Sequence, residues 1–391
     1  MVFKQDYAFW SLVHHIVTKE HFRILKISES QNEVWLESLE NKHAQLIRLL
    51  RYDLDWSNWM HRDMEATLHN VEKVRRKFNK KNVRALNIYV STYPPVDEWS
   101  FRLEKPLAFG KQKQSSLQTY LIHTNDFQTG VKDLSTFFGT SIQIENENFV
   151  YDTNIIKELK HEVLTVAKNR AKSEQKLFYQ GKPLFTYLFI ATQVIMFLVL
   201  EMNGGSTNPL TLLKYGAKES QLIIEGQWWR FLTPIVLHIG FFHLFMNTLA
   251  LYYLGTAVER IYGNVRFFLI YLLSGFTGSV ASFAFSPSIS AGASGAIFGC
   301  FGALLYFGVV YPRLFFRTMG MNIIVVLAIN LLLGLLIPIV DNAGHIGGLI
   351  GGFLAAGVLH LPKHRQLFRQ IVLLIIMTVI TLGLLYYGYN F

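Results

Sequence analysis

The sequence predicts an α-helical polytopic membrane protein with a soluble α/β domain at its N-terminus. Of its 391 residues, 51% are hydrophobic and only 16% are charged. Most of the charged residues lie before residue 183, whereas residues 183–391 consist mainly of long apolar runs. We therefore expect a soluble domain over residues 1–166, the end of a linker helix over 167–182 and a membrane-spanning part after it.

Seven apolar stretches in the second half each approach the roughly 20 residues that cross the hydrocarbon core of a bilayer. Each of them is predicted to be a transmembrane helix. They occupy residues 184–202, 235–254, 267–286, 293–311, 322–340, 343–361 and 370–388. The first six fall within residues 183–361, and the seventh, within residues 362–391, is an additional C-terminal helix.

Lysine and arginine residues indicate how these helices are oriented, because loops rich in them face the cytoplasm. Such residues precede the first stretch and follow the second, fourth and sixth, with Arg260, Arg313 and Arg369 as examples. This pattern predicts a multi-pass protein of the cell membrane whose N-terminus is cytoplasmic and whose C-terminus is extracellular. The N-terminus lacks an apolar signal-peptide core, which agrees with a cytoplasmic first half.

Two polar residues stand among glycines where apolar stretches begin: Ser294 between Gly292 and Gly295, and His345 after Gly344. Polar side chains are costly in hydrocarbon unless they have a partner or a function. The glycines let two helices approach closely, so ordinary helix packing is one interpretation. The other is that the serine is a nucleophile and the histidine its general base, held in a membrane.

A third polar patch begins the second stretch with His238, His243 and Asn247. His243 and Asn247 are four residues apart and share a helix face, so they could donate to an oxyanion or simply satisfy one another. His238 fits a structural role near the surface. Three histidines also suggest a metal site, but no cysteine or carboxylate stands at ligand spacing. Asp341 is expected to cap the sixth helix rather than to orient His345, which leaves a dyad.

These motifs together resemble those of rhomboid intramembrane serine proteases. The matching segments are GxSG at 292–295, HxxxxHxxxN at 238–247, GHxxGxxxG at 344–352 and Gln-Trp-Trp-Arg-Phe at 227–231. The resemblance implies a six-helix core over residues 183–361, with Ser294 as nucleophile and His345 as general base. It also implies that His243 and Asn247 complete the oxyanion site and that the ring of Phe298 lies against the catalytic histidine.

The seventh helix and the soluble N-terminal domain are similar to those of Gram-positive rhomboids, which implies a bacterial cell membrane. Such proteases cleave transmembrane segments of membrane proteins within the bilayer, near its outer face, without a cofactor. A membrane quality-control protease is a further candidate partner. The alternative is a non-catalytic rhomboid-like factor that binds membrane proteins in quality control, although degenerate relatives usually lose the serine or the histidine.

The soluble half is predicted to contain helices and strands in alternation. The expected order is a helix at 7–18, strands at 22–27, 33–39 and 45–50, a helix at 57–77, strands at 85–90 and 119–123, and a long helix at 154–175. This order occurs in nuclease-like α/β folds, but no Asp…Glu-x-Lys constellation accompanies it. The likeness is therefore one of fold and not of activity.

Acidic and histidine side chains gather near the start of the helix at 57–77, namely Asp53, Asp55, His61 and Asp63, with Glu65 and His69 beyond them. They could bind a regulatory Mn²⁺ or Zn²⁺, or they could be a helix start that favours acidic residues. A basic run follows between residues 73 and 84. We expect these lysine and arginine side chains to attract the domain to an anionic membrane surface rather than to bind nucleic acid.

Overall fold

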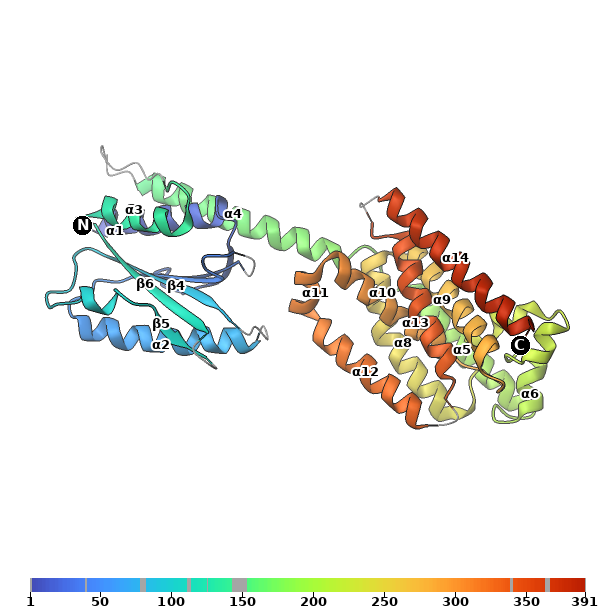
Figure 1. Cartoon of the computed structure of the whole chain (residues 1–391). Coiled ribbons are helices and arrows are strands. Elements are labelled where there is room, and N and C mark those ends of the chain that lie inside the picture. Colours follow the sequence, from blue (N-terminus) through green and yellow to red (C-terminus); the bar gives the residue numbers. More distant parts are fainter. Residues whose placement is uncertain are drawn as a thin grey trace. The chain divides into compact units, whose positions relative to one another are not determined.

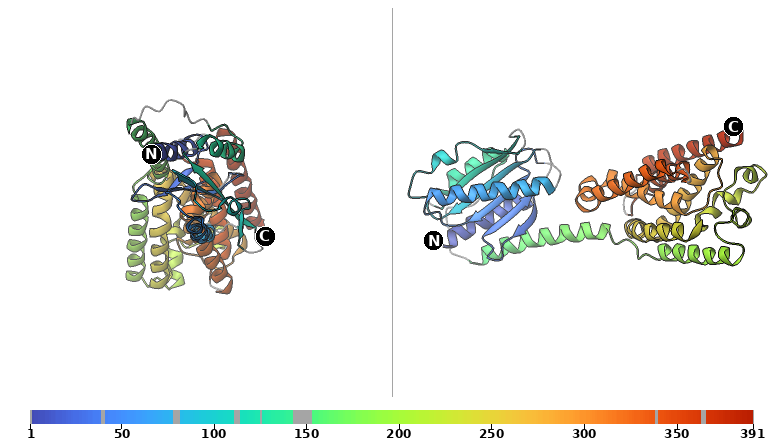
Figure 2. Two further views of the ribbon diagram at one scale, coloured as in Figure 1. Left: turned by 90° about the vertical axis from the view of Figure 1, so that its left-hand side faces the viewer. Right: turned by 90° about the horizontal axis from the view of Figure 1, so that it is seen from below.

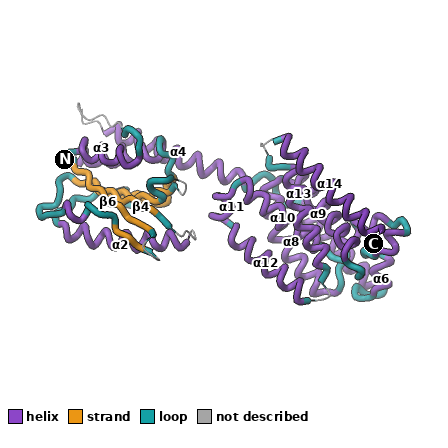
Figure 3. Tube along the Cα trace, in the orientation of Figure 1, coloured by secondary structure: helices purple, strands orange, loops and turns teal. Residues whose placement is uncertain are grey.

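The computed structural model describes residues 2–38, 41–77, 82–110, 114–124, 126–142, 153–337, 340–362 and 366–390. The chain forms two compact units, Met1–Lys172 and Ser173–Phe391 (Figure 1). The first unit contains a β-sheet and the second consists of helices and loops (Figure 3). The predicted combination of a helical membrane part with an N-terminal α/β domain is therefore confirmed.

The first unit is built on a six-stranded sheet with the strand order β1-β2-β3-β4-β6-β5. The first three strands form an antiparallel meander, β3, β4 and β6 are parallel, and β5 pairs antiparallel at the edge. The strands are β1 (Arg23–Ile27), β2 (Glu33–Glu37), β3 (Leu46–Arg51), β4 (Arg84–Ser91), β5 (Leu107–Phe109) and β6 (Ser115–His123). The central strand β4 is buried from Ala85 to Ser91, as expected for a parallel strand that is covered on both faces.

Helices cover both faces of this sheet (Figure 2). Alternate residues of β4 point to opposite faces: Leu86 and Ile88 join the core formed with α1 (Val2–Thr18), α3 (Phe127–Phe138) and the start of α4 (Thr153–Leu177). Tyr89 faces the other way and packs with Met60 and Met64 of α2 (Ser57–Lys77). The sheet is thus the middle of three layers.

The second unit contains a helix in each of the seven predicted apolar stretches. These helices are α5 (Phe185–Met202), α8 (Gly240–Tyr262), α9 (Asn264–Phe285), α10 (Ser294–Val310), α12 (Gly320–Leu336), α13 (Asn342–Leu359) and α14 (Leu367–Asn390). Among the described residues, five helices are individually long and apolar enough to span a membrane, and α11 (Pro312–Thr318) with α12 forms a sixth, bent by 74°. The remaining helix, α10, is apolar but only 17 residues long.

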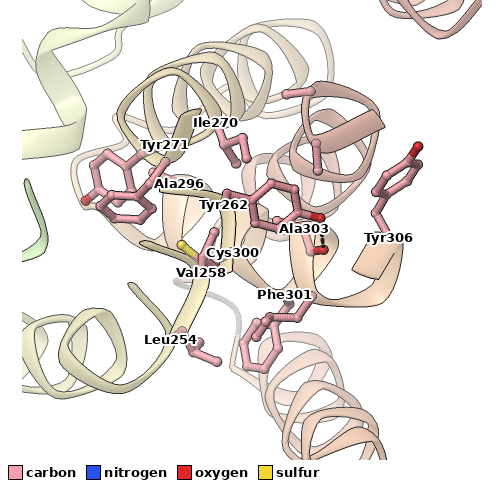
Figure 4. Close-up of a cluster of buried hydrophobic side chains, with 14 of the residues drawn as sticks. Leu254, Val258, Tyr262, Ile270, Tyr271, Ala296, Cys300, Phe301, Ala303 and Tyr306 are labelled. Carbon is pink, nitrogen blue, oxygen red and sulfur yellow. Dashed lines mark hydrogen bonds between the residues drawn. The ribbon is translucent and has the colours of Figure 1, made fainter. Parts of the chain in front are cut away.

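Helix α10 lies at the centre of the unit, and its residues are buried from Ala296 to Leu304. The hydroxyl of Tyr262, on α8, donates a hydrogen bond of 2.8 Å to the carbonyl of Ala303 (Figure 4). A helix that is apolar on every side is stable only where other helices surround it. The short length of α10 therefore suits a position inside the bundle, where other helices surround it.

The fully buried carboxylate of Glu259, on α8, holds the N-terminus of α5. It accepts hydrogen bonds from the backbone N–H groups of Leu184, Phe185 and Thr186, and from the side chains of Thr186 and Asn264. The first N–H groups of a helix have no partner within the helix, and the helix dipole favours a negative charge beside them. One buried carboxylate therefore fixes where the first membrane helix begins.

Two helices lie at the periphery of the bundle. Helix α12 buries only Gly320, Leu327 and Gly334, and α14 buries only Met377 among their described residues. A cavity of about 430 Å³ with an almost wholly apolar lining lies between parts of α14, α9 and α13. Peripheral helices with so little buried surface can move at a lower free-energy cost than α10 or α13.

Candidate active site

The N-terminal turns of α10 and α13 come together because their facing surfaces consist of glycine. A Cβ on Gly348 would lie 2.9 Å from the Cα of Gly295, and one on Gly352 would lie 2.6 Å from the carbonyl carbon of Gly299. Such distances are too short for any side chain, so the two backbones are in direct contact. A Cβ on Gly295 would also lie 3.3 Å from the carbonyl oxygen of Gly344. The residue after Ser294 therefore faces the residue before His345.

The imidazole of His345 is held by an aromatic ring from α10. Phe298, one turn after Ser294, stacks on it with 4.2 Å between ring centroids and 10° between ring planes. This is the position that the resemblance implies for Phe298. Within the described residues, Nδ1 of His345 is buried and has no hydrogen-bond partner. Stacking, rather than a carboxylate, therefore sets the orientation of the ring.

Asp341 caps α13, as the sequence predicted. Its carboxylate accepts a hydrogen bond of 2.9 Å from the N–H of Gly344. A second backbone bond, from the N–H of His345 to the carbonyl of Asp341, continues the first turn at 3.1 Å. The carboxylate thus satisfies a free helix N–H, and its described hydrogen bond goes to the backbone and not to the imidazole of His345.

His243 approaches the backbone of Gly292 more closely than a side chain there would allow. A Cβ on Gly292 would lie 2.7 Å from Cε1 and 3.0 Å from Nε2 of His243, and 3.7 Å from Oγ of Ser294. On the other side of the ring, Nδ1 of His243 accepts a hydrogen bond of 3.4 Å from the N–H of Ile239. An imidazole whose Nδ1 accepts carries its proton on Nε2 when it is neutral. His243 can therefore donate a hydrogen bond toward the space in front of Ser294.

Asn247 and His238 occupy different positions around His243. The buried amide of Asn247 donates 2.9 Å to the carbonyl of His243, one turn earlier in α8. An amide nitrogen carries two hydrogens, so a second one remains for another acceptor. His238 is fully buried, and its Nε2 accepts a hydrogen bond of 3.4 Å from the N–H of Ala293. It thus supports the backbone directly before Ser294, in line with the structural role predicted for it.

Comparison with known proteins identifies the family. Residues 225–362 match the rhomboid domain. The chain is 43% identical over 387 residues to rhomboid protease GluP of Bacillus subtilis (strain 168), which covers 99% of this chain and 75% of that protein. This chain belongs to the rhomboid family. It is also 40% identical over 167 residues to RHOMBOID-like protein 1 of Arabidopsis thaliana, covering 41% of this chain and 42% of that one.

A mitochondrial rhomboid of the same plant, RHOMBOID-like protein 6, is 42% identical over 147 residues, which cover 37% of this chain and 48% of that protein. The plant relatives match only part of the chain, whereas the similarity to the Bacillus protease extends over almost all of it. The chain is therefore an intramembrane protease of the rhomboid type, whose substrates are transmembrane proteins in a lipid bilayer. Rhomboid proteases need no cofactor for catalysis.

The predicted metal ligands of this rhomboid's N-terminal unit are not brought together. No group of three His, Cys, Asp or Glu side chains in the described part of the chain is arranged to hold a metal ion. Asp53 accepts hydrogen bonds from Gln5 and from the N–H of Thr92, and Asp55 is exposed. His61 lies 3.6 Å from the carboxylate of Glu65.

The carboxylate of Asp63 is paired with the guanidinium of the buried Arg48. Its two oxygens accept from Nη1 and Nη2 of Arg48 at 2.5 Å and 3.1 Å, and one also accepts from the hydroxyl of Tyr89 at 2.6 Å. Burial opposes the charge of Arg48, but the bonds to Asp63 and Glu33 outweigh it and raise the pKa of Arg48. Burial, with the charge of Asp63, also raises the pKa of Tyr89. A carboxylate already paired in this way is a poor metal ligand, and no sequence pattern indicated that Arg48 would reach it.

Two further residues of structural weight escaped the sequence analysis. Glu259-Arg260 fits the rhomboid pattern, but nothing in the sequence indicated what Glu259 binds, and Lys218 was one lysine among others in the long loop. Both are fully buried. Except for Asn264, which is five residues from Glu259, their partners lie 68 to 75 residues away along the chain, so no local pattern could have revealed these contacts.

Proposed function

We propose that this rhomboid cleaves transmembrane segments with a dyad of Ser294 and His345, near the outer face of the membrane. The observation that carries the proposal is the backbone contact between α10 and α13, which sets these two residues in the first turns of adjoining helices. The stack of Phe298 on His345 supports it further. The glycine face alone would also suit ordinary helix packing, so the aromatic ring that orients His345 is the contact that favours a functional histidine.

In the proposed reaction, an unprotonated His345 accepts the hydroxyl proton of Ser294 while Oγ attacks the scissile carbonyl carbon. The tetrahedral intermediate collapses as the C–N bond breaks, and His345 returns the proton to the leaving amine. A water molecule then gives its proton to His345 and attacks the acyl-enzyme. Collapse of the second intermediate releases the new carboxylate and restores the hydroxyl of Ser294.

The oxyanion formed in both steps needs donors that are in place before the reaction. Nε2 of His243 and Oγ of Ser294 both lie beside Gly292, and we assign the N–H of Ser294, at the start of α10, as a donor together with Nε2–H of His243. We assign the second hydrogen of the Asn247 amide to the same site. Removal of one such donor typically lowers turnover about 10²–10³-fold, so His243→Ala should cost more than Asn247→Ala, whose amide is partly engaged within its own helix.

Two groups of contacts support cleavage on the outer side. Lys218, in the loop between α5 and α8, pairs with Ser290 just before α10, so this loop lies at the end of the bundle that carries Ser294. This loop holds Lys214, Lys218 and Arg230. The basic residues of the other interhelical loops lie at the opposite end, where Arg266 donates to the carbonyl of Leu359 and Arg317 pairs with Glu174. Positive residues favour the cytoplasmic side. Figure 1 shows α6 (Pro209–Lys214) and α11 at these opposite ends of the unit.

A substrate has to reach Ser294 sideways from the bilayer. Helix α12 is a suitable gate because it buries few residues and bends by 74° against α11. Pro338, in the loop after α12, lies outside the described residues. The carbonyl of a helical peptide bond is already hydrogen-bonded, so the substrate must unwind locally before attack. Transmembrane segments that contain Gly, Pro or Asn near their outer ends should therefore be preferred.

The test is cleavage of a model transmembrane substrate in liposomes by wild type, Ser294→Ala and His345→Ala. Both variants should lose cleavage while still inserting and folding. Ser288→Ala is a matched control, since Ser288 is an exposed serine of the loop before α10. Near-wild-type turnover in either dyad variant would contradict the assignment. Binding of the substrate without cleavage by the wild type would favour the alternative of a non-catalytic binding factor.

A further inference from the structure

Lys218 is a fully buried lysine in a loop outside the membrane-spanning helices. Its Nζ donates to the carbonyl oxygens of Ser286 and Ser288 at 2.5 Å and 3.3 Å. Its backbone pairs with Ser290 in an antiparallel bridge, with N···O distances of 2.8 Å and 3.0 Å. Lysine is among the residues least often fully buried. A single residue thus makes four hydrogen bonds to the segment between α9 and α10.

The segment that Lys218 contacts leads directly to the nucleophile. Farther along it, the N–H of Gly292 donates to the carbonyl of Pro234 at 3.0 Å, and the N–H of Ala293 donates to Nε2 of His238 at 3.4 Å. These later contacts hold the end of the segment next to Ser294. Lys218 holds its beginning and middle, over residues 286–290.

Two further hydrogen bonds hold the backbone directly before Lys218. Nη1 of the buried Arg230 donates 2.7 Å to the carbonyl of Ala217, and the hydroxyl of Thr233 donates 2.5 Å to the carbonyl of Gly216. Gly216 has a φ of +101°, and a Cβ there would lie 2.6 Å from Oγ1 of Thr233. Only glycine fits such a turn. The ammonium therefore extends from a rigid loop toward residues 286–290.

We infer that Lys218 is a positioning residue, whose ammonium fixes the segment at residues 286–293 and so sets the backbone at Gly292 and Ser294 for oxyanion binding. The inference rests on the proposed function and deepens it. Lys218 does not touch the reacting atoms and acts through the chain that carries them. A shift of about 1 Å in such groups can lower turnover about 10²-fold.

The charge of Lys218 favours this role over one in stability. Burial lowers the pKa of its ammonium, while the nearby carboxylates of Asp341 and Glu219 raise it by less. Because the folded pKa lies below the unfolded one, the unfolded chain binds more protons between the two values, and stability rises with pH there. The charged form thus works against folding. Ser288 is exposed and Ser286 half-buried, so water can reach their carbonyls when the lysine is replaced.

The test compares kcat and KM of the full chain in liposomes for wild type, Lys218→Met and Lys218→Arg, with active enzyme counted by a fluorophosphonate. Lys214→Met is the matched control, because Lys214 is an exposed lysine of the same loop. We expect Lys218→Met to lower kcat by roughly 10- to 100-fold, with KM within about twofold and an unchanged melting temperature. Lys218→Arg should recover part of kcat, and Lys214→Met should match wild type.

A pH profile separates positioning from simple structural support. The wild-type kcat should fall on the alkaline side with an apparent pKa below that of a free lysine, as the ammonium loses its proton. The charged groups that act on the ammonium are the carboxylates of Asp341 and Glu219. This alkaline decline should be absent from Lys218→Met and from Lys218→Arg, whose guanidinium stays protonated.

Several results would overturn the inference. These are an unchanged kcat per labelled site in Lys218→Met, a loss of kcat that merely follows a lowered melting temperature, or an alkaline decline that persists in Lys218→Arg. Failure of the wild type to cleave, or to be labelled at Ser294, would instead refute the proposed function on which the inference rests.

Discussion

Replacement of Glu259 by glutamine should destabilise the membrane part through the start of α5. Oε1 of Glu259 accepts from the N–H groups of Leu184 and Phe185 and from Asn264, at 2.9, 2.8 and 2.6 Å. Oε2 accepts from the N–H and the hydroxyl of Thr186 at 2.9 and 2.7 Å. Glutamine keeps one accepting oxygen but places an NH₂ group where the second oxygen accepted two bonds.

The magnitude follows from the donors left without a partner. The hydroxyl of Thr186 can rotate and accept from the new NH₂ group, but its backbone N–H cannot, and a buried donor without a partner costs about 1–3 kcal/mol. The three bonds to the remaining oxygen then go to a neutral acceptor. Hydrogen bonds to a charged group are stronger than neutral ones by about 0.5–1.5 kcal/mol each. Partial relaxation reduces the sum, so we expect the free energy of unfolding to fall by about 3–5 kcal/mol.

The assay is equilibrium unfolding of Glu259→Gln and wild type in detergent micelles, followed by the loss of helical circular dichroism. Glu225→Gln is the matched control, because Glu225 is an exposed glutamate, and surface changes of this kind usually stay within about 0.5 kcal/mol. A loss below about 1 kcal/mol for Glu259→Gln would refute the reasoning that one carboxylate secures the helix start.

Further outcomes concern other contacts. Gly348→Leu should prevent the close approach of α13 to Gly295 and abolish both folding and cleavage. Gly383→Leu is the control and should leave both intact, because the space around Gly383 on α14 is open. Normal cleavage by Gly348→Leu would contradict the glycine contact. Asp63→Asn should destabilise the N-terminal unit by about 3 kcal/mol, because Arg48 loses a partner while buried, and hydrogen exchange of its amides would measure this. Sub-millimolar Zn²⁺ should leave the NMR signals around Asp63 unshifted, and specific shifts there would favour the predicted metal site.

The membrane helices could be predicted because their signal is local. About 20 consecutive apolar residues identify a spanning helix from the sequence alone, and each predicted stretch does contain a helix. The boundaries were less exact: α8 begins at Gly240, whereas the apolar run begins at residue 235. The difference arises because residues 233–236 form a separate short helix before α8.

The soluble unit was harder to predict where strands are short or polar. Neither β5 nor α3 was anticipated. The edge strand β5 has only three residues, which is too few for an alternating pattern. Helix α3 ends just before Gly139 and has apolar residues at helical spacing, but this short pattern was not recognised as a helix. The acidic cluster misled for another reason. Its members are close in sequence, but Asp63 faces the sheet and meets Arg48, a pairing that depends on how α2 packs against β3.

In the candidate active site, too, some contacts could be predicted from the sequence and others could not. The glycine spacings around Ser294 and His345 predicted a close contact between two helices, which the backbone contact between α10 and α13 provides. The orientation of His243 depends on a bond from Ile239 and on the lack of a side chain at Gly292. Such details arise from tertiary packing and are not encoded in any single motif.

Intact-mass measurement of the protein after treatment with a fluorophosphonate tests the central claim most directly. An activated serine forms one covalent adduct, and peptide mapping locates it. We predict a single adduct at Ser294 in the wild type, and none in Ser294→Ala or in His345→Ala, which lacks the base. An adduct at another serine, or full labelling of His345→Ala, would contradict the assignment of Ser294 and His345 as the catalytic dyad.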